Sequence, residues 1–563
     1  MIEKINILFI LINIAIIVYT FYISYHKANS VNTSKINPLI IIPVIITGAI
    51  IRLIYLDAIP YGLQQDEASI GYEAFSLLTY GVDRNLYPYP VYPITWGSGG
   101  GSPIMIYLTM LSSSIFGTNV FSLRIVPAFL GVITLIIFYL ILKELHNTEE
   151  IAIAGTAFLS ICPWHVILSR WSLDSNTVPF WVSLAILFFI KATKSQKTSF
   201  YILAAAGLSL CLYSYGSSTI VIPLTILFAC TYALYKGNLS IKQLLFSFIS
   251  FLIVAIPIGY FYMVNYIGLP EIKTALVTIN KFTCNRIGSV FLSGSDTPLQ
   301  SLIENIKGLF LSLTIGNDAK EMTCNYYPGF ATLLEYTFPI TFLGIGVMFK
   351  NFFKSLKKNE DYYHGSIWLF MLIASLILNL LINQDINRMV FMYLPLVYAF
   401  TVGLESILRA SFKVFALAGI MSVAGCMLFL FCYFTDYNNS CGSIFMPGYG
   451  EACTYADTLI KDNGSEGTVY SSYTDVAAPY MLALYYTKTS PFEFYDTVVY
   501  KDPEAEFRIA SSFGHFIFEL PEDAAVNNYS GDVFIIAAGE KYIFDGTDYE
   551  MTDFGKYTVV VPN

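Results

Sequence analysis

Three short segments carry acidic and basic side chains at the ends of apolar runs. They are YGLQQDE, with Asp66 and Glu67, SRWSLD, with Arg170 and Asp174, and NQDINR, which ends at Arg388. One carboxylate can accept a proton from an attacking hydroxyl, a second can hold a divalent metal, and an arginine can bind a departing phosphate. The three segments together therefore suit group transfer from a phosphate. A helix cap at Asp66 and structural ion pairs explain the same residues with less chemistry.

The elements that must position these side chains are membrane spans. Of the 563 residues, 55% are apolar and 13% are charged, whereas about a quarter are charged in a soluble protein. Apolar runs of the ~20 residues that cross a bilayer recur along the chain. We predict twelve spans, at residues 5–25, 38–59, 119–142, 151–169, 176–193, 199–216, 218–235, 244–267, 329–349, 364–383, 388–408 and 412–434. The apolar stretch from Pro103 to Gly117 is too short and too polar for a span, and we predict an interfacial helix there.

Basic residues orient these spans. With the N-terminus outside, one set of short loops holds 14 lysines and arginines, which makes these loops cytoplasmic. The opposite face receives two long loops, residues 60–118 and 268–328, the turns near Asp174 and Asn387, and everything after Thr435. All three segments with candidate chemistry then lie on the exterior face. The first span lacks a small-residue cleavage site, so we predict a span rather than a signal peptide.

The last 129 residues differ from the rest, because they contain 20 acidic and 6 basic residues and no candidate span. Short β-rich runs at 468–473, 515–520, 532–537 and 557–561 alternate with expected helices at 448–462 and 476–487. We predict a transmembrane module over residues 1–434 and a small extracytoplasmic α/β domain over residues 435–563. The net charge of -9, which argues against nucleic-acid binding, therefore sums an acidic domain and a module with basic loops.

Four of the nine cysteines lie on the predicted exterior, Cys284 with Cys324 and Cys441 with Cys453. The exterior is the oxidising side, so two disulfides are one expectation and free thiols are the other. No spacing among cysteines and histidines resembles a zinc site. His165 lies in an apolar span and is expected to make a structural hydrogen bond.

The sequence around these segments resembles bacterial GT-C glycosyltransferases. The strings that carry the resemblance are YGLQQDEASIGYEAF, SPIMIYL, IFGTNVFSLRIVPAFLG and SICPWHVILSRWSLDSNT. They follow one order: an Asp-Glu pair after a core span, Ser-Pro before the interfacial helix, Phe-Gly then Leu-Arg-Ile-Val-Pro, and Pro-Trp-His with Ser-Arg. The group is family 39, or dolichyl-phosphate-mannose-protein mannosyltransferase-like, and includes protein O-mannosyltransferases and aminoarabinose transferases. The resemblance covers roughly residues 45–410 and implies a polytopic α-helical fold of GT-C type.

The resemblance also implies roles for four residues, Asp66, Glu67, Asp174 and Arg388, and Arg170 is a further candidate. Asp66 matches the catalytic base, and Glu67 matches an acidic neighbour that shapes the site. Arg388 and Arg170 are expected to bind the donor phosphate. Asp174 lies where relatives offer an acid that sometimes holds a metal, so the metal expected here is Mg²⁺ or Mn²⁺.

The first exterior loop departs from the family pattern. Some relatives place a lysine before a Pro-Pro pair, whereas this chain has GGGSP at residues 99–103. The glycines would let backbone N–H groups face an anion, but flexibility is the simpler explanation. Four aromatic residues of this loop offer faces for stacking on a sugar, with ordinary packing as the alternative: Tyr72, Tyr89, Tyr92 and Trp96. Arg84, in the same loop, is expected to be exposed.

The predicted function is transfer of a sugar from a polyprenyl-phosphate donor to an extracytoplasmic acceptor, either a protein, a cell-wall polymer or a glycolipid. Asp66 would deprotonate the acceptor, and the sugar would invert in one displacement. A transporter or flippase for a lipid-linked glycan is one alternative, although few ionisable residues lie mid-span. A catalytically silent relative that binds partners is another. The chain is expected in the cell membrane, with the lipid bilayer and no nucleic acid among its partners.

Overall fold

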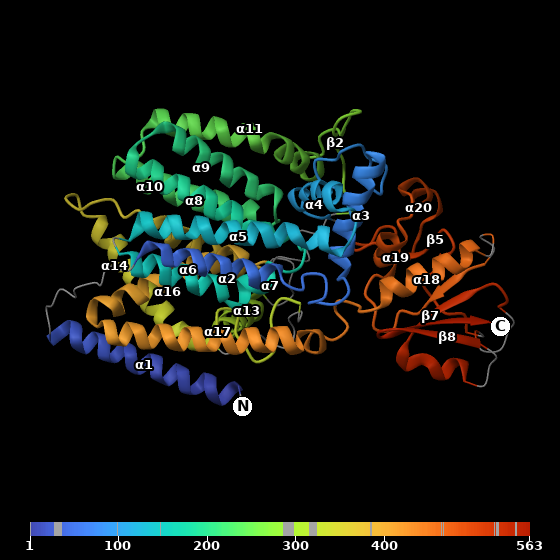
Figure 1. Cartoon of the computed structure of the whole chain (residues 1–563). Coiled ribbons are helices and arrows are strands. Elements are labelled where there is room, and N and C mark those ends of the chain that lie inside the picture. Colours follow the sequence, from blue (N-terminus) through green and yellow to red (C-terminus); the bar gives the residue numbers. More distant parts are fainter. Residues whose placement is uncertain are drawn as a thin grey trace.

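A bundle of long helices carries a β-sheet domain at one end (Figure 1). The structure is a computed structural model. It describes residues 2–26, 37–97, 99–146, 148–284, 298–314, 324–382, 385–462, 464, 467–522, 524, 529–545 and 549–562. We name the end of the bundle that carries the sheet the domain end. The predicted architecture, a helical membrane module followed by an α/β domain, is confirmed.

The bundle is built from helices whose bounds follow the hydropathy of the sequence. They are α1 (Ile2–His26), α2 (Ile41–Leu53), α3 (Gln65–Tyr80), α4 (Pro103–Phe116), α5 (Val120–Leu145), α6 (Glu149–Ile161), α7 (Pro163–Leu168), α8 (Val178–Ser195), α9 (Thr198–Leu210), α10 (Ser218–Tyr235), α11 (Ile241–Tyr266), α13 (Pro298–Thr314), α14 (Phe338–Ser355), α15 (Ser366–Leu381), α16 (Val390–Ala410) and α17 (Phe412–Ser440). Short 3-10 turns precede or follow some of them: η1 (Pro38–Ile40), η2 (Asp174–Thr177), η3 (Cys211–Tyr213) and η5 (Glu335–Thr337).

Every predicted span overlaps a helix, although some helices are shorter than predicted: α2 ends at Leu53 in the span predicted at 38–59, and α9 ends at Leu210 in the span predicted at 199–216. Three further spans differ as follows. The span predicted at 151–169 is two helices, because Cys162 is extended and Pro163, which lacks an N–H, begins α7. The span predicted at 329–349 begins later, after η5, as α14. The last helix, α17, continues to Ser440, beyond the boundary predicted at residue 434.

Among the described residues, six helical stretches are long and apolar enough to cross a membrane. They are Val120–Leu145, Asp174–Ser195, Ser218–Tyr235, Ile241–Tyr266, Val390–Ala410 and Phe412–Ser440. Shorter apolar stretches are Ile7–Ile23, Pro38–Leu53, Pro103–Phe116, Thr198–Tyr213 and Ser366–Leu381. By length and composition, the bundle is therefore suited to a membrane.

The lysine-rich loops gather at the end of the bundle opposite the domain end (Figure 1). Side chains join these loops to one another. Lys194 Nζ lies 3.1 Å from Glu144 Oε2, and Lys236 Nζ donates to Lys357 O at 3.1 Å. This segregation agrees with the cytoplasmic assignment of the basic loops.

The C-terminal domain is a mixed sheet flanked by helices. Its strands are β3 (Val469–Ser471), β4 (Val499–Tyr500), β5 (Ala510–Phe513), β6 (Phe516–Ile517), β7 (Val533–Ala537), β8 (Tyr549–Phe554) and β9 (Tyr557–Pro562), in the order β4-β5-β6-β3-β7-β9-β8. Its helices are α18 (Tyr449–Asp462), α19 (Pro479–Thr487), α20 (Pro491–Thr497) and the 3-10 helix η6 (Ala538–Phe544). Central β3 pairs in parallel with β6 and β7, and the other pairings are antiparallel. A small hairpin, β1 (Ile272–Lys273) and β2 (Thr278–Ile279), belongs to the second long loop.

The C-terminal domain docks on α3, in the first exterior loop. Helix α19 packs against α3, where Tyr72 Oη donates to Thr489 O at 2.9 Å. Close beneath this contact, Arg84 is paired with Glu73 and donates to Ser69 Oγ at 2.9 Å. Arg84 is therefore buried, contrary to the exposed position expected from the sequence, because the docked domain covers it.

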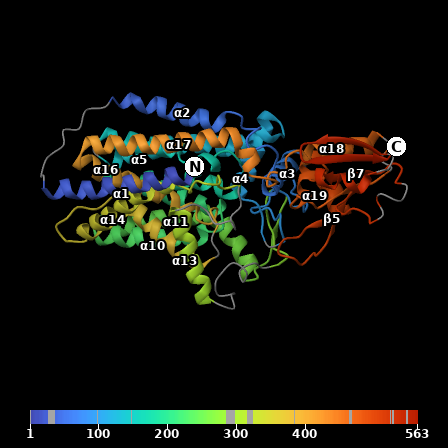
Figure 2. The same cartoon turned by 90° about the horizontal axis from the view of Figure 1, so that it is seen from below.

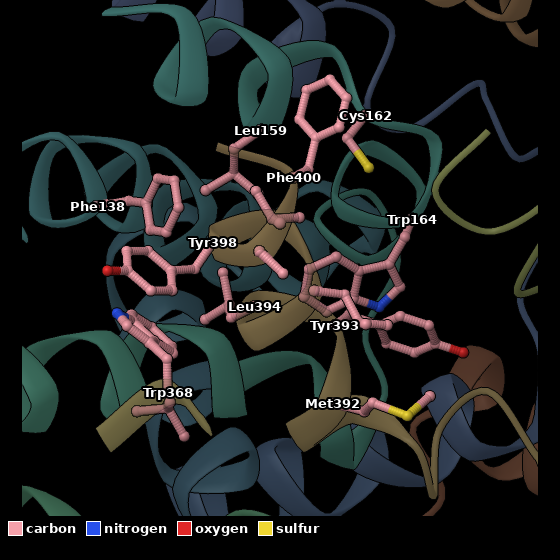
Figure 3. Packing of buried hydrophobic residues seen from close by; sticks show 14 of the residues in the cluster. Phe138, Leu159, Cys162, Trp164, Trp368, Met392, Tyr393, Leu394, Tyr398 and Phe400 are labelled. Atoms are coloured by element: carbon pink, nitrogen blue, oxygen red, sulfur yellow. The ribbon is translucent and has the colours of Figure 1, made fainter. Parts of the chain in front are cut away.

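Aromatic packing fixes the helices that carry the candidate residues (Figure 3). The rings of Trp164 in α7 and Tyr393 in α16 lie 4.9 Å apart, and those of Trp368 and Tyr398 lie 5.7 Å apart. Both α7 and the start of α16 lead into turns at the domain end. The core therefore determines how the turn with Asp174 lies relative to the turn with Arg388.

Candidate functional site

Asp66 lies in the first turn of α3. Gln64 is the cap of this helix: its Oε1 accepts from Asp66 N at 2.5 Å, and its Nε2 donates to Asp66 Oδ2 at 3.3 Å. The capping role considered for Asp66 thus belongs to Gln64. The Asp66 carboxylate is partly exposed and lies at the positive end of the helix dipole.

Asp174 lies at the domain end, where the first turn of α3 carries Asp66 (Figure 1). Its Oδ1 accepts a hydrogen bond of 2.7 Å from Ser102 N, and Ser102 in turn caps α4. The two carboxylates, Asp66 and Asp174, lie close enough to repel each other. Two of the three candidate segments are thus joined through the loop before α4.

Gly100, in the loop before α4, allows close packing of the backbone. A Cβ on Gly100 would lie 1.6 Å from Pro93 O, so the loop tolerates no side chain there. The N–H of Ser102, next to the glycines, binds the carboxylate of Asp174. The anion bound at this loop is therefore the carboxylate of Asp174.

The turn with Arg388 reaches the same place. Ser175 Oγ lies 3.5 Å from Asn387 Oδ1, and Asp385 Oδ1 accepts from Asn387 N at 2.7 Å. Burial raises the pKa of the Cys324 thiol, and the carboxylates of Asp385 and Asp66 raise it further. Cys324 is thus near both acids, and the partly exposed Arg388 belongs to the same surface.

Glu67 faces away from this surface and holds it in place. Its carboxylate accepts two hydrogen bonds of 2.8 Å from Arg124 and one of 2.9 Å from Ser172 N, and neither side chain of the ion pair is exposed. Arg124 also donates to Pro60 O at 2.5 Å and to Gly62 O at 2.7 Å. The pair ties the start of the first loop, α5 and the turn before Asp174 together.

Arg170 lies apart from the carboxylates and closes the end of α2. Its Nη1 donates to Ile51 O at 2.6 Å and its Nη2 to Ile54 O at 2.8 Å. Its Nε donates to Tyr433 Oη at 3.3 Å, and the guanidinium is fully buried. This geometry does not fit the expected contact with a donor phosphate, because the guanidinium is engaged with backbone carbonyls.

The remaining expectations concern histidine, cysteine and aromatic side chains. His165 makes a structural hydrogen bond as expected, since its Nδ1 lies 2.5 Å from Arg52 Nη2. The cysteines are free thiols, and Cys284 Sγ donates to Ala505 O at 3.4 Å rather than pairing with Cys324. Three of the four aromatic residues considered for stacking on a sugar pack inside the protein instead. Tyr72 is buried beside Phe494, Tyr92 stacks on Phe261, and Trp96 packs on Tyr480. Tyr89 is exposed.

Two residues of the site were not singled out from the sequence. Arg124 is the buried partner of Glu67, and an arginine near the start of an apolar span does predict some partner at that depth. Asp385 lies three residues before Arg388, and its neighbourhood with Asp66 depends on long-range packing. Of these two residues, only Arg124 could have been identified from the sequence, as a charged residue near the start of an apolar span.

The metal expected at Asp174 has two carboxylates available. No group of three or more His, Cys, Asp and Glu side chains suited to a metal occurs among the described residues. Mg²⁺ commonly uses one or two carboxylates and takes its other ligands from water and substrate phosphate. Asp66 and Asp174 would be the two carboxylates of such a site.

An apolar cavity of about 580 Å³ lies between α6, α16 and α17. Its walls include Phe158 and Ile161 of α6, Leu404 of α16, and Gly419 and Ile420 of α17. A smaller cavity at the domain end is bordered by Asn176, Asn325 and Asn387, together with Trp164 and others. The first offers apolar surface within the bundle, and the second offers amide groups beside the carboxylates.

Comparison with known proteins finds a family match over part of the chain and solved structures with a similar fold. The family described as dolichyl-phosphate-mannose-protein mannosyltransferase matches residues 101–261, less than a third of the chain. No curated protein matches the sequence. ArnT from Cupriavidus metallidurans, solved with undecaprenyl phosphate, has a TM-score of 0.51 at 10% identity; the match covers 92% of this chain and 97% of ArnT. Because the bundle ends at Ser440, this likeness includes part of the C-terminal domain.

Larger transferases are similar over part of their length. The archaeal oligosaccharyltransferase AglB from Archaeoglobus fulgidus, solved with an inhibitory peptide and a dolichol-phosphate, has a TM-score of 0.43 at 15% identity. The match covers 80% of this chain, and the chain spans 64% of AglB. The O-mannosyltransferase complex Pmt1-Pmt2 of S. cerevisiae, bound to the sugar donor, has a TM-score of 0.31 at 17% identity over 41% of this chain and 33% of that chain.

Proposed function

Because this chain has the fold of GT-C glycosyltransferases, we propose that it transfers a sugar from a polyprenyl-phosphate donor to an acceptor hydroxyl at the domain end. One observation supports the proposal: the turns that carry Asp174 and Arg388 contact each other through Ser175 and Asn387, at the end of the bundle where the first turn of α3 carries Asp66 (Figure 1). A base, a second carboxylate and a cation at one surface are what displacement of a lipid phosphate requires. In the predicted topology, this surface is extracytoplasmic.

In the proposed reaction, Asp66 accepts the proton of the acceptor hydroxyl. The acceptor oxygen bonds to the anomeric carbon as the bond from that carbon to the phosphate oxygen breaks, so the configuration inverts. Arg388 binds the departing lipid phosphate through charge-assisted hydrogen bonds. A positioned base contributes about 10²- to 10⁴-fold in rate.

Two further residues support Asp66 in this proposal. Glu67, held by Arg124 and Ser172, positions the helical turn that presents Asp66. Asp66 and Asp174 would hold a divalent cation, Mg²⁺ or Mn²⁺. When bound, such a cation stabilises negative charge on a phosphate.

The donor's lipid also has a place within the bundle. The cavity between α6, α16 and α17 has apolar walls that suit an isoprenoid chain. The phosphate of such a lipid would lie at the domain end, near Arg388. The acceptor, whether protein, polymer or glycolipid, would approach beneath the C-terminal domain, which docks on the helix that carries Asp66.

The transport alternative has less support. Arg52, a charged residue within a predicted span, is enclosed by its own bonds to Gly48 O and Ser160 O, each at 2.8 Å. A side chain satisfied in this way is a structural one rather than part of a substrate path. The alternative of a catalytically silent binding protein gives no chemical reason for Asp66 and Asp174 to lie at the same end of the bundle.

The test is transfer from a synthetic polyprenyl-phosphate sugar by the purified chain to acceptors of its own membranes. We expect Asp66→Asn to lower the rate at least 10²-fold while the protein stays folded. Asp57→Asn is the matched control, since Asp57 is exposed and nearby in the chain. Near-normal transfer by Asp66→Asn would remove the base from the proposal, and no transfer by the wild type with any such donor would favour the silent or transport alternatives.

A further inference from the structure

Helix α13 lies in the loop at residues 268–328, where the sequence predicted no helix. It docks on the domain end of α15: Asn305 Nδ2 donates to Leu380 O at 3.2 Å and to Ile382 O at 2.9 Å. It also packs beside η5. One side of the helix is thus fixed where α15 ends.

A second side of α13 is apolar and exposed. Four side chains form this stripe, with exposed fractions of 72% for Leu299, 58% for Ile303, 51% for Ile306 and 55% for Phe310. At about 100° per residue, they share a sector of about 60°. Four large apolar side chains aligned in this way indicate contact with an apolar medium or partner.

A third side of α13 is polar and also exposed. It carries Gln300, Glu304 and Lys307, with Gln300 Nε2 donating to Glu304 Oε1 at 3.1 Å. This polar side adjoins the apolar stripe. A helix with one apolar and one polar exposed side is typical of segments that lie in a membrane interface.

The position of α13 favours lipid as the medium. Figure 2 shows α13 projecting from the side of the bundle, across the direction of the long helices. The last turns of α15 beside it also expose apolar side chains, 37% of Ile377 and 45% of Leu381. The stripe and the exposed apolar side chains of α15 thus belong to two helices that contact each other where α15 ends.

We propose that α13 is an interfacial helix whose stripe, Leu299, Ile303, Ile306 and Phe310, inserts among the acyl chains of the leaflet at the domain end. The chain passes from Ile382, which α13 holds, to Arg388 within six residues. The inserted helix thus borders the side from which a lipid-borne donor reaches Arg388. This last step rests on the proposed function, whereas the insertion does not.

Photo-crosslinking of the full chain in phosphatidylethanolamine and phosphatidylglycerol vesicles tests the insertion. One variant carries p-benzoylphenylalanine in place of Phe310, and the matched control carries it in place of Glu304 on the polar side. We expect a phospholipid adduct, detected by its mass, at position 310 and little at position 304. Crosslinks from position 310 to a second copy or to another part of the chain, or equal lipid adducts at both positions, would overturn the proposal.

A kinetic comparison tests the link to the donor. Ile303→Asn with Phe310→Asn should raise KM several-fold for a long-chain polyprenyl-phosphate sugar and leave KM for a short-chain, water-soluble analogue unchanged. Gln300→Ala, on the polar side, should change neither. Equal loss with both donors would contradict the link. Absence of transfer by the wild type would instead count against the proposed function, and the crosslinking result would stand independently.

Discussion

At the residue scale, two adjacent acids have different roles: Asp66 is the proposed base, and Glu67 positions it. Asp66 is partly exposed beside Asp174, whereas Glu67 is fully buried against Arg124. Removing one member of a buried ion pair leaves the other charged and unsolvated, which costs about 3–5 kcal/mol. The sequence places both acids side by side, and their different partners decide their different roles.

Glu67→Ala should therefore lower both stability and transfer. We expect a loss in unfolding free energy of about 3–5 kcal/mol, because Arg124 would stay buried without its partner. Thermal unfolding in detergent measures this loss. Glu144→Ala is the control: Glu144 and Lys194 form a pair with 33% and 37% of their side chains exposed, and such pairs contribute about 0–1 kcal/mol. Equal effects of the two substitutions would contradict the positioning role of Glu67.

Asp174 gives the second prediction at this scale. If Asp66 and Asp174 hold Mg²⁺ or Mn²⁺, chelation should abolish transfer and either metal should restore it. Asp174→Asn should raise the metal concentration needed for half-maximal rate at least tenfold, since it removes one of two charged ligands. Titration of the transfer rate with metal measures this shift. Unchanged transfer after chelation would show that the two carboxylates act without a metal.

At the element scale, the hydropathy of the sequence was enough to place the spans, because each carries a long apolar run. Helix α13 was missed because the polar residues on one of its sides, Gln300, Glu304 and Lys307, lower its mean hydropathy below that of a span. The edge strands β4 and β8, and β5 next to β4, were also missed, since they are short or largely exposed and lack a regular apolar alternation. Partners that are distant in the chain, such as Arg124 for Glu67, leave no local pattern at all.

Close packing of α14 on α16 illustrates such a long-range constraint. A Cβ on Gly344 would lie 1.7 Å from Ala399 O, and one on Gly403 would lie 2.2 Å from Ile340 O. The two backbones touch at these glycines, as small residues allow in membrane bundles. Since α16 begins just after Arg388, this contact also sets where the site's cation lies.

Gly344→Ala should therefore destabilise the bundle, by about 1–3 kcal/mol as overpacking does. Gly346→Ala is a matched control on the same helix, because nothing lies within 4 Å of its Cβ position. The control should be neutral or slightly stabilising, since alanine favours helix by up to about 1 kcal/mol over glycine. The midpoint of thermal unfolding in detergent distinguishes them, and equal midpoints would mean that α14 can move away from α16.

At the scale of the whole molecule, the distribution of charge and the arrangement of the bundle and domain predict the same orientation in the membrane. The chain has 20 acidic and 6 basic residues after Phe434, and its lysine-rich loops lie at the opposite end of the bundle. The positive-inside rule then predicts that the C-terminal domain, and with it Asp66 and Arg388, lies outside the cytoplasm. A lipid-linked donor and an exterior acceptor would meet on that side only.

Cysteine labelling of intact cells tests this orientation. Glu550→Cys places a thiol on the exposed side of β8, and Lys358→Cys places one in a lysine-rich loop between α14 and α15. We expect a membrane-impermeant maleimide to label Glu550→Cys in intact cells, and Lys358→Cys only after the membrane is permeabilised. The wild type supplies the background from its nine cysteines, most of which are buried. The reverse pattern would place the carboxylates on the cytoplasmic side, where the basic loops were predicted, and the extracytoplasmic acceptor would have to be abandoned.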